Sequence, residues 1–107
     1  MAAFRIQNFS VEFLIDTGSS ISLIPLSVSK ALSCLLSSSS ILLKAADGRS
    51  IAVHGQTHLT LRNSSLRRSF IWVFVVADVA KPILGADFLS KFRISVNCFE
   101  RAIDDTN

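Results

Sequence analysis

The chain has 107 residues, half of them hydrophobic, and a formal net charge of +3 at neutral pH. This length suits one compact domain with a buried core. The longest apolar run, Phe70 to Ala77, is much shorter than the roughly 20 residues of a membrane-spanning helix. The N-terminus has no apolar stretch typical of a signal peptide. We therefore expect a single domain over residues 1–107, located in the cytoplasm and not in a membrane.

Most of the chain consists of short runs of Val, Ile, Leu and Phe, separated by turn residues at intervals of about ten. This pattern predicts an all-β domain. The expected strands are Val11 to Ile15, Ile21 to Ile24, Ile41 to Lys44, Ile51 to His54, Thr57 to Leu61, Phe70 to Val76 and Ile94 to Cys98. Polar His58 and Thr60 alternate with Leu59 and Leu61, which predicts a half-exposed strand.

Two stretches favour short helices instead. Ser27 to Leu35 follows Pro25, and Ala86 to Phe92 begins beside Asp87, which we expect to be its N-cap. The serine run at 37–40 is interpreted as a loop.

Several polar or reactive residues have plain structural interpretations. Cys34 and Cys98 lack C-x-x-C spacing, so we interpret both as small buried hydrophobic side chains. A disulfide between them is the alternative. His54 and His58 are interpreted as solvated strand residues, and Trp72 as core.

The only local concentration of positive charge is found near a polar stretch, at Arg62, Arg67 and Arg68. It predicts a solvated hairpin loop. A nucleic-acid contact is the alternative, but it would normally bring more basic residues and exposed aromatic rings. We therefore expect no nucleic-acid partner.

The segment Val11 to Ser20 carries the first chemical signal. Asp16 directly follows a hydrophobic strand, and Thr17, Gly18 and Ser19 come next. The strand draws the carboxylate toward the interior, where an ionised acid is costly unless it is hydrogen-bonded or shares a proton with a neighbour. Gly18 allows another backbone to approach. The plain alternative is an Asp that only caps its own turn.

The second signal lies about seventy residues further on, where Lys81 to Leu89 contains a hydrophobic pair, a glycine and the start of a helix. With both segments present, the sequence resembles the retropepsins, the aspartic proteases of retroviruses and long-terminal-repeat retrotransposons. The resemblance covers about Val11 to Asn97. The sequence of Leu84 to Leu89 looks closer to that of gypsy-type retrotransposon proteases than to that of mammalian retroviral proteases.

This resemblance implies a homodimeric acid protease with a small closed β-barrel and one or two short helices. The order of the parts also matches: an active-site loop at 16–20, a flap hairpin at about 43–55, and a C-terminal helix and strand at 86–98. Retroviral enzymes carry an acid in place of Ser20 and an arginine in place of Ala86. Here both partners are missing together, so neither is left as an orphan charge.

The resemblance also implies the site. Each of two chains contributes Asp16, and the two carboxyls hold one proton between them and activate a water molecule. Thr17 braces the paired loops, Gly18 offers its carbonyl to the substrate, and Ser19 steadies the outer oxygen of the carboxylate. The residues expected to bind substrate are Ser19, Ser20, Ala46, Asp47, Gly48, Val79, Pro82 and Ile83, with Ile24 as a further apolar candidate. Neither a metal nor a cofactor is needed.

The hairpin also has support from its own residues. Asp47-Gly48 lies between two apolar runs and is a strong signal for a tight turn. A mobile hairpin over a cleft would exclude water and hold an extended peptide. An ordinary surface hairpin is the alternative.

The expected function is therefore an aspartic endopeptidase that acts as a homodimer on an extended peptide, such as the Gag-Pol polyprotein of a retroelement, in the cytoplasm or in virus-like particles. Two alternatives remain. One is a catalytically silent protease-like module for dimerisation or peptide binding, and the other is a small β-barrel that binds nucleic acid.

Overall fold

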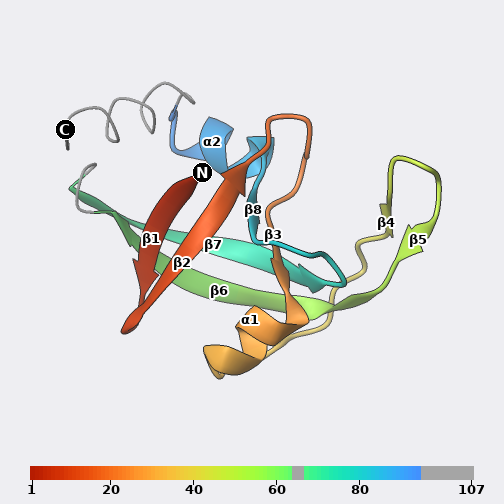
Figure 1. The fold of residues 1–107 in the computed structure, drawn as a ribbon, viewed down its shortest axis with the longest axis horizontal. Coiled ribbons are helices and arrows are strands. Elements are labelled where there is room, and N and C mark those ends of the chain that lie inside the picture. Colours follow the sequence, from red (N-terminus) through yellow and green to blue (C-terminus); the bar gives the residue numbers. More distant parts are fainter. Residues whose placement is uncertain (64–66, 95–107) are drawn as a thin grey trace.

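A computed structural model describes residues 1–63 and 67–94 of the chain. Within these two ranges, six strands close into a barrel (Figure 1). Around the barrel their order is β1 (Ala2–Ile6), β2 (Phe9–Ile15), β8 (Ile83–Leu84), β3 (Leu23–Pro25), β7 (Arg68–Ala77) and β6 (Val53–Asn63). The helices α1 (Leu26–Ala31) and α2 (Ala86–Lys91) are short. The predicted all-β barrel with two short helices is confirmed.

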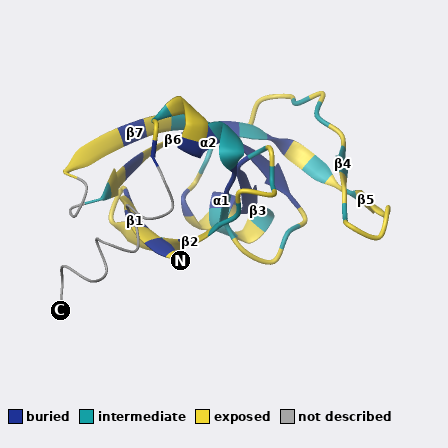
Figure 2. Cartoon of the chain, turned by 90° about the horizontal axis from the view of Figure 1, so that it is seen from above, coloured by how far each residue is buried: buried dark blue, intermediate teal, exposed yellow. Residues whose placement is uncertain are grey.

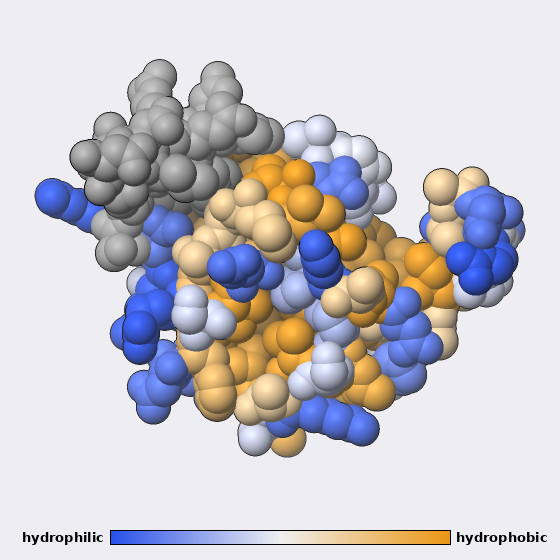
Figure 3. Space-filling view, viewed as in Figure 1, coloured by the Kyte–Doolittle hydropathy of each residue, from blue (hydrophilic) through white to orange (hydrophobic). Residues whose placement is uncertain are grey.

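Strands β4 (Leu43–Lys44) and β5 (Ser50–Ile51) form a separate antiparallel hairpin. This hairpin, residues 43–51, stands away from the barrel in the ribbon and space-filling views (Figures 1 and 3). Most of its residues are exposed or half-buried, whereas buried residues concentrate in the barrel (Figure 2). The hairpin therefore gains little from the core, and its position depends on how its two ends are attached.

Alternating burial in the long strands directs one face of each into a shared core. In β1, Ala2, Phe4 and Ile6 are buried while the residues between them are exposed. In β6, Leu59 and Leu61 are buried while His58 and Thr60 are exposed, as predicted.

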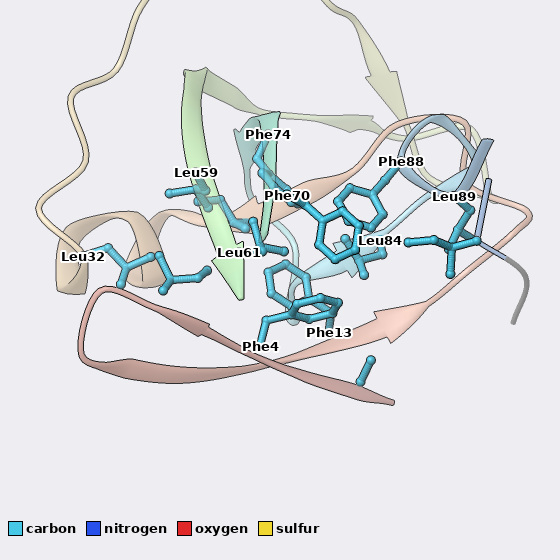
Figure 4. Packing of buried hydrophobic residues seen from close by; sticks show 14 of the residues in the cluster. Phe4, Phe13, Leu32, Leu59, Leu61, Phe70, Phe74, Leu84, Phe88 and Leu89 are labelled. Atoms are coloured by element: carbon cyan, nitrogen blue, oxygen red, sulfur yellow. The ribbon is translucent and has the colours of Figure 1, made fainter. Parts of the chain in front are cut away.

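The centre of the core is a cluster of phenylalanine rings from four elements (Figure 4). Phe4 packs edge-on against Phe13 with ring centroids 5.7 Å apart, and Phe70 lies 5.3 Å from Phe88. Each fully buried ring of this kind stabilises the fold by about 1.5–3 kcal/mol. Because Phe88 lies on α2, the cluster fixes this helix against the barrel wall.

Several predicted boundaries need correction. Strand β1 was not predicted, the strand expected at Ile21 to Ile24 is Leu23–Pro25, and the strand expected at Ile41 to Lys44 is only Leu43–Lys44. The helix expected over Ser27 to Leu35 ends at Ala31. Leu42 is 93% exposed, so no burial extends the strand there. Apart from Ile94, the predicted strand Ile94 to Cys98 lies outside the described residues.

No helix in the two described ranges is long and apolar enough to cross a membrane.

Candidate active site

Asp16 begins the loop that follows β2, and the neighbouring strand β8 fixes where this loop starts. Strands β2 and β8 are parallel, with Leu14 opposite Ile83 and Ile15 opposite Leu84. The Asp16 N–H donates to the Leu84 carbonyl at 3.0 Å. The two segments that carried the sequence signals are therefore adjacent strands.

The loop itself is a tight turn closed by the Asp16 side chain. The Gly18 N–H donates to Asp16 Oδ1 at 3.0 Å, and the Ser19 N–H donates to the Asp16 carbonyl at 3.1 Å. The Asp16 residue is half-buried, and its Oδ2 atom receives no hydrogen bond from the described residues. One carboxylate oxygen is thus held by the backbone, and the other is available to a further partner.

Gly85 permits a close contact between this loop and the start of α2. A Cβ atom at this position would lie 2.7 Å from the Ser19 carbonyl oxygen and 2.8 Å from that of Ile21. The Ala86 N–H also donates to the Ser19 carbonyl at 2.7 Å. The loop that carries Asp16 therefore rests directly on the backbone of the second motif, and only glycine fits between them.

The Asp87 carboxylate supports the Asp16 loop through hydrogen bonds to Ser22, a residue just after that loop. The expectation that Asp87 is the N-cap of α2 is wrong. The N-cap of α2 is Gly85, in an extended conformation and without a side-chain cap. Asp87 instead accepts hydrogen bonds from the Ser22 N–H at 3.1 Å, the Ser22 hydroxyl at 2.7 Å, Trp72 Nε1 at 3.0 Å and the Phe88 N–H at 2.8 Å.

Ser22 links this support back to the glycine. It is fully buried, and its hydroxyl oxygen accepts the Gly85 N–H at 2.9 Å. Sequence reasoning missed both Ser22 and the hydrogen bond of Trp72. The Trp72 ring is half-buried and packs against the core, as predicted, while its Nε1 reaches Asp87. The sequence shows only that a serine follows the motif, and nothing in it indicates that this serine is buried.

The other residues predicted at the site differ in their surroundings. Thr17, Gly18 and Ser20 are exposed on the loop. The Ser19 hydroxyl donates to the Ile21 carbonyl at 2.7 Å, and so is directed at the backbone instead of the Asp16 carboxylate. Among the predicted wall residues, Val79, Pro82 and Ile83 are half-buried, whereas Ile24 is completely buried core and cannot line a pocket.

The predicted hairpin turn is present. Gly48 has φ +87°, and its N–H donates to the Ala45 carbonyl at 2.9 Å. Asp47 accepts the Arg49 N–H at 3.1 Å and pairs with the Arg49 guanidinium at 2.6 Å. Ala46, Asp47 and Gly48 are all exposed. No hydrogen bond within the described part of the single chain joins this turn to the Asp16 loop.

A cavity of about 370 Å³ lies at the base of the hairpin, and nine residues line it: Ser39, Ser40, Ile41, Leu42, Leu43, Lys44, Ser50, Ile51 and Val53.

The other reactive side chains of the described residues form no second site. The described residues contain no cluster of His, Cys, Asp and Glu that could hold a metal ion. Cys34 is a free thiol, and burial raises its pKa, an effect that a hydrogen bond with the Thr57 side chain partly opposes. A raised pKa keeps the thiol protonated and unreactive at neutral pH. Cys98 lies outside the described residues.

The fold is similar to those of known aspartic proteases. EIAV protease, solved in complex with the inhibitor HBY-793, superposes with a TM-score of 0.72 at 20% identity, over 88% of this chain and 88% of that one. The retroviral protease-like domain of Ddi1 from Leishmania major gives 0.69 at 14% identity, over 89% and 78%. A retropepsin-like aspartic protease from Rickettsia conorii gives 0.59 at 16% identity, over 83% and 68%.

A comparison with curated protein sequences finds no significant match. The family model described as gag-polyprotein putative aspartyl protease matches residues 2–91, which include β1, the Asp16 loop, the hairpin and α2. The chain therefore belongs to this aspartyl protease family and has the retropepsin-like fold.

Proposed function

We propose that the chain is an aspartic endopeptidase that acts as a homodimer, with one Asp16 from each copy. The observation that carries this proposal is the state of the Asp16 carboxyl. One of its oxygens is oriented by the Gly18 N–H, and the other has no partner among the described residues of the single chain. The residue sits on a loop braced from below, at the end of a strand, and is only half-buried. A second copy of the loop can therefore meet it.

Two Asp16 carboxyl groups placed close together can act as the acid and the base of peptide hydrolysis. Like charges that close together cannot both ionise, so the pair holds one proton over a broad pH range. The ionised carboxyl removes a proton from a water molecule between them, while the protonated one donates to the carbonyl oxygen of the peptide. The water then attacks the carbonyl carbon to give a tetrahedral intermediate, without a covalent link to the enzyme.

The neighbouring residues take supporting roles in this proposal. The exposed Thr17 and Gly18 contact the second loop and the substrate backbone, and Ser19 and Ser20 extend that contact. The hairpin turn at Ala46, Asp47 and Gly48 closes over an extended peptide, and its positive φ at Gly48 supports a tight, narrow tip.

The walls of the cleft are formed by Val79, Pro82 and Ile83. Val79 follows β7, and Pro82 and Ile83 lie beside β2, the strand that leads into the Asp16 loop. We further propose that the substrate is a retroelement Gag-Pol polyprotein, processed in the cytoplasm or in virus-like particles. The family description, a protease of a gag polyprotein, supports this substrate class.

A peptide-library cleavage assay tests the proposal. The wild-type protein should cleave peptides, and a pepstatin-like transition-state mimic should block cleavage. Asp16→Asn should remain folded but lose at least about a hundredfold in rate, because an amide provides neither acid nor base catalysis. Glu12→Gln is the matched control, since Glu12 is an exposed acid on β2, the strand that leads into the Asp16 loop. Inhibitor binding without cleavage would indicate a silent module, and cleavage unaffected by Asp16→Asn would contradict the proposed residue.

A further inference from the structure

The hairpin is attached to the barrel through a β-bulge. Val53 of β6 pairs with Ala77, but Gly55 pairs with Val76, so His54 is an extra residue with no partner in the ladder. Gly55 has φ +142°, and a Cβ atom on it would lie 2.6 Å from the Ser37 carbonyl oxygen. Bulges bend a strand and redirect its side chains. Here the bend lies between the barrel and the hairpin.

The redirected side chain makes a specific contact. His54 Nε2 lies 2.6 Å from Oδ1 of Asp78, the first residue after β7. A carboxylate only accepts hydrogen bonds, so Nε2 carries the proton in this contact. The Asp78 N–H also donates to the Ala52 carbonyl at 3.0 Å. One side-chain and one backbone contact therefore join the arm of the hairpin to the connection between β7 and β8.

The contact adds little to folding stability. The side chains of His54 and Asp78 are 32% and 60% exposed, and exposed pairs of this kind stabilise proteins only weakly. Its position is more informative than its strength. Asp78 is followed by Val79 and then by Pro82, which form a wall of the proposed cleft, while His54 lies on the arm that leads to the proposed lid.

We propose that His54 and Asp78 are positioning residues that hold the hairpin of residues 43–51 at a fixed distance from the 78–82 connection. This inference rests on the proposed function for its catalytic consequence, because the peptide would lie between the lid and the wall. Loss of the pair would let the two move independently. Peptide binding would then weaken, while chemistry at the Asp16 pair would be left unchanged.

Hydrogen exchange tests the structural half of this inference without requiring activity. The informative amide is that of residue 78, which donates to the Ala52 carbonyl across the joint between the hairpin arm and the connection. The amides of Ala45 and Gly48 are bonded within the hairpin and serve as the internal reference. In His54→Ala and in Asp78→Ala the protection of the residue 78 amide, measured relative to its intrinsic exchange rate, should fall about two- to fivefold, the range expected for one exposed ion pair. The double variant should exchange no faster than either single variant. His54→Gln, which keeps a donor of similar reach, should restore most of the protection.

His58→Ala is the matched control, because His58 is an exposed histidine on the same strand, opposite Val73 and away from the bulge. It should leave these amides unchanged. Equal exchange in the wild type and the His54 and Asp78 variants would overturn the inference, as would additive effects in the double variant.

Kinetics then test the catalytic half. With an active wild-type protein, His54→Ala and Asp78→Ala should raise KM about two- to fivefold with kcat nearly constant, and His54→Gln should restore KM. An unchanged KM, or a loss confined to kcat, would contradict a positioning role even though the protease is active. An inactive wild type would contradict the proposed function alone, and the exchange measurement would still decide whether the pair holds the hairpin.

Discussion

Asp16 and Asp87 are two acids with opposite surroundings. Asp87 accepts four hydrogen bonds: two from Ser22 just before β3, one from Trp72 of β7 and one from its own helix. They use both of its carboxylate oxygens. Among the described residues, the Asp16 carboxylate accepts one hydrogen bond, from the Gly18 N–H of its own turn. A carboxylate surrounded by fixed donors serves as structure, because its lone pairs are occupied. One with an open oxygen can exchange a proton. At the scale of single residues, this difference separates the support from the reactive group.

Removal of the support should be costly. Asp87→Ala leaves the N–H and hydroxyl of the buried Ser22 without their acceptor and frees Trp72 Nε1. Each unsatisfied buried donor costs about 1–3 kcal/mol, so we expect the free energy of unfolding to fall by about 3 kcal/mol in urea titrations. Asp47→Ala is the control, since its ion pair is exposed and should contribute less than about 1 kcal/mol. Equal stability of the two variants would mean that Asp87 does not support the loop.

Residues whose roles depend on distant partners could not be predicted from the sequence. Asp16 was identified because its chemistry is local: a strand, an acid, a glycine and hydroxyl residues in succession. Asp87 was assigned as an N-cap because an acid in a first helical turn usually has that role. Its main partner lies 65 residues away, and only the fold brings the two together. The contact of His54 with Asp78 was missed for the same reason.

At the scale of elements, the site depends on the close packing of the two motifs at Gly85. This packing differs from the strain at Gly48, where the backbone has φ +87° and a Cβ atom would meet nothing within 4 Å. One glycine is required by a steric contact, and the other by backbone conformation. The two requirements predict different consequences for substitution by alanine.

Gly85→Ala should affect both stability and the site. Its Cβ would lie 2.7 Å from the Ser19 carbonyl oxygen, so the backbone of the Asp16 loop would have to move. We therefore expect the free energy of unfolding to fall by about 2–3 kcal/mol and peptide cleavage to be lost. Gly48→Ala should lower the free energy of unfolding by only about 1 kcal/mol, the penalty for a left-handed backbone conformation. It should also slow peptide cleavage, because Gly48 lies at the tip of the hairpin proposed to close over the substrate. Urea titrations with peptide-cleavage assays compare the two. The account of the packing would be wrong if Gly85→Ala were as stable as the wild type.

Strand and helix types were predicted better than their ends. Long strands such as β6 and β7 carry enough alternation or apolar length to be recognised. The short alternating run of β1 was missed because one of its three buried residues is a small alanine. The hairpin strands were predicted to be longer than they are, because apolar Leu42 points to solvent and its burial cannot be judged from sequence. Propensity indicates an element, and tertiary packing sets its ends.

At the scale of the whole molecule, the proposed enzyme is incomplete as one chain. The sequence contains one Asp-Thr-Gly segment, and its single barrel provides one proposed lid and one wall. Under the proposed function a complete site needs a second copy, so every catalytic property should depend on pairing. This dependence follows because each chain provides one Asp16 and the proposed mechanism uses two.

The most direct test of this central claim is to mix wild-type protein with folded Asp16→Asn protein, let the subunits exchange, and measure peptide cleavage at constant total concentration. If each site needs an Asp16 from both chains, an equal mixture should retain about a quarter of the wild-type activity, because only paired wild-type chains are active. If one chain provided a complete site, about half would remain. Retention of half the activity under conditions of complete exchange would contradict the two-chain active site.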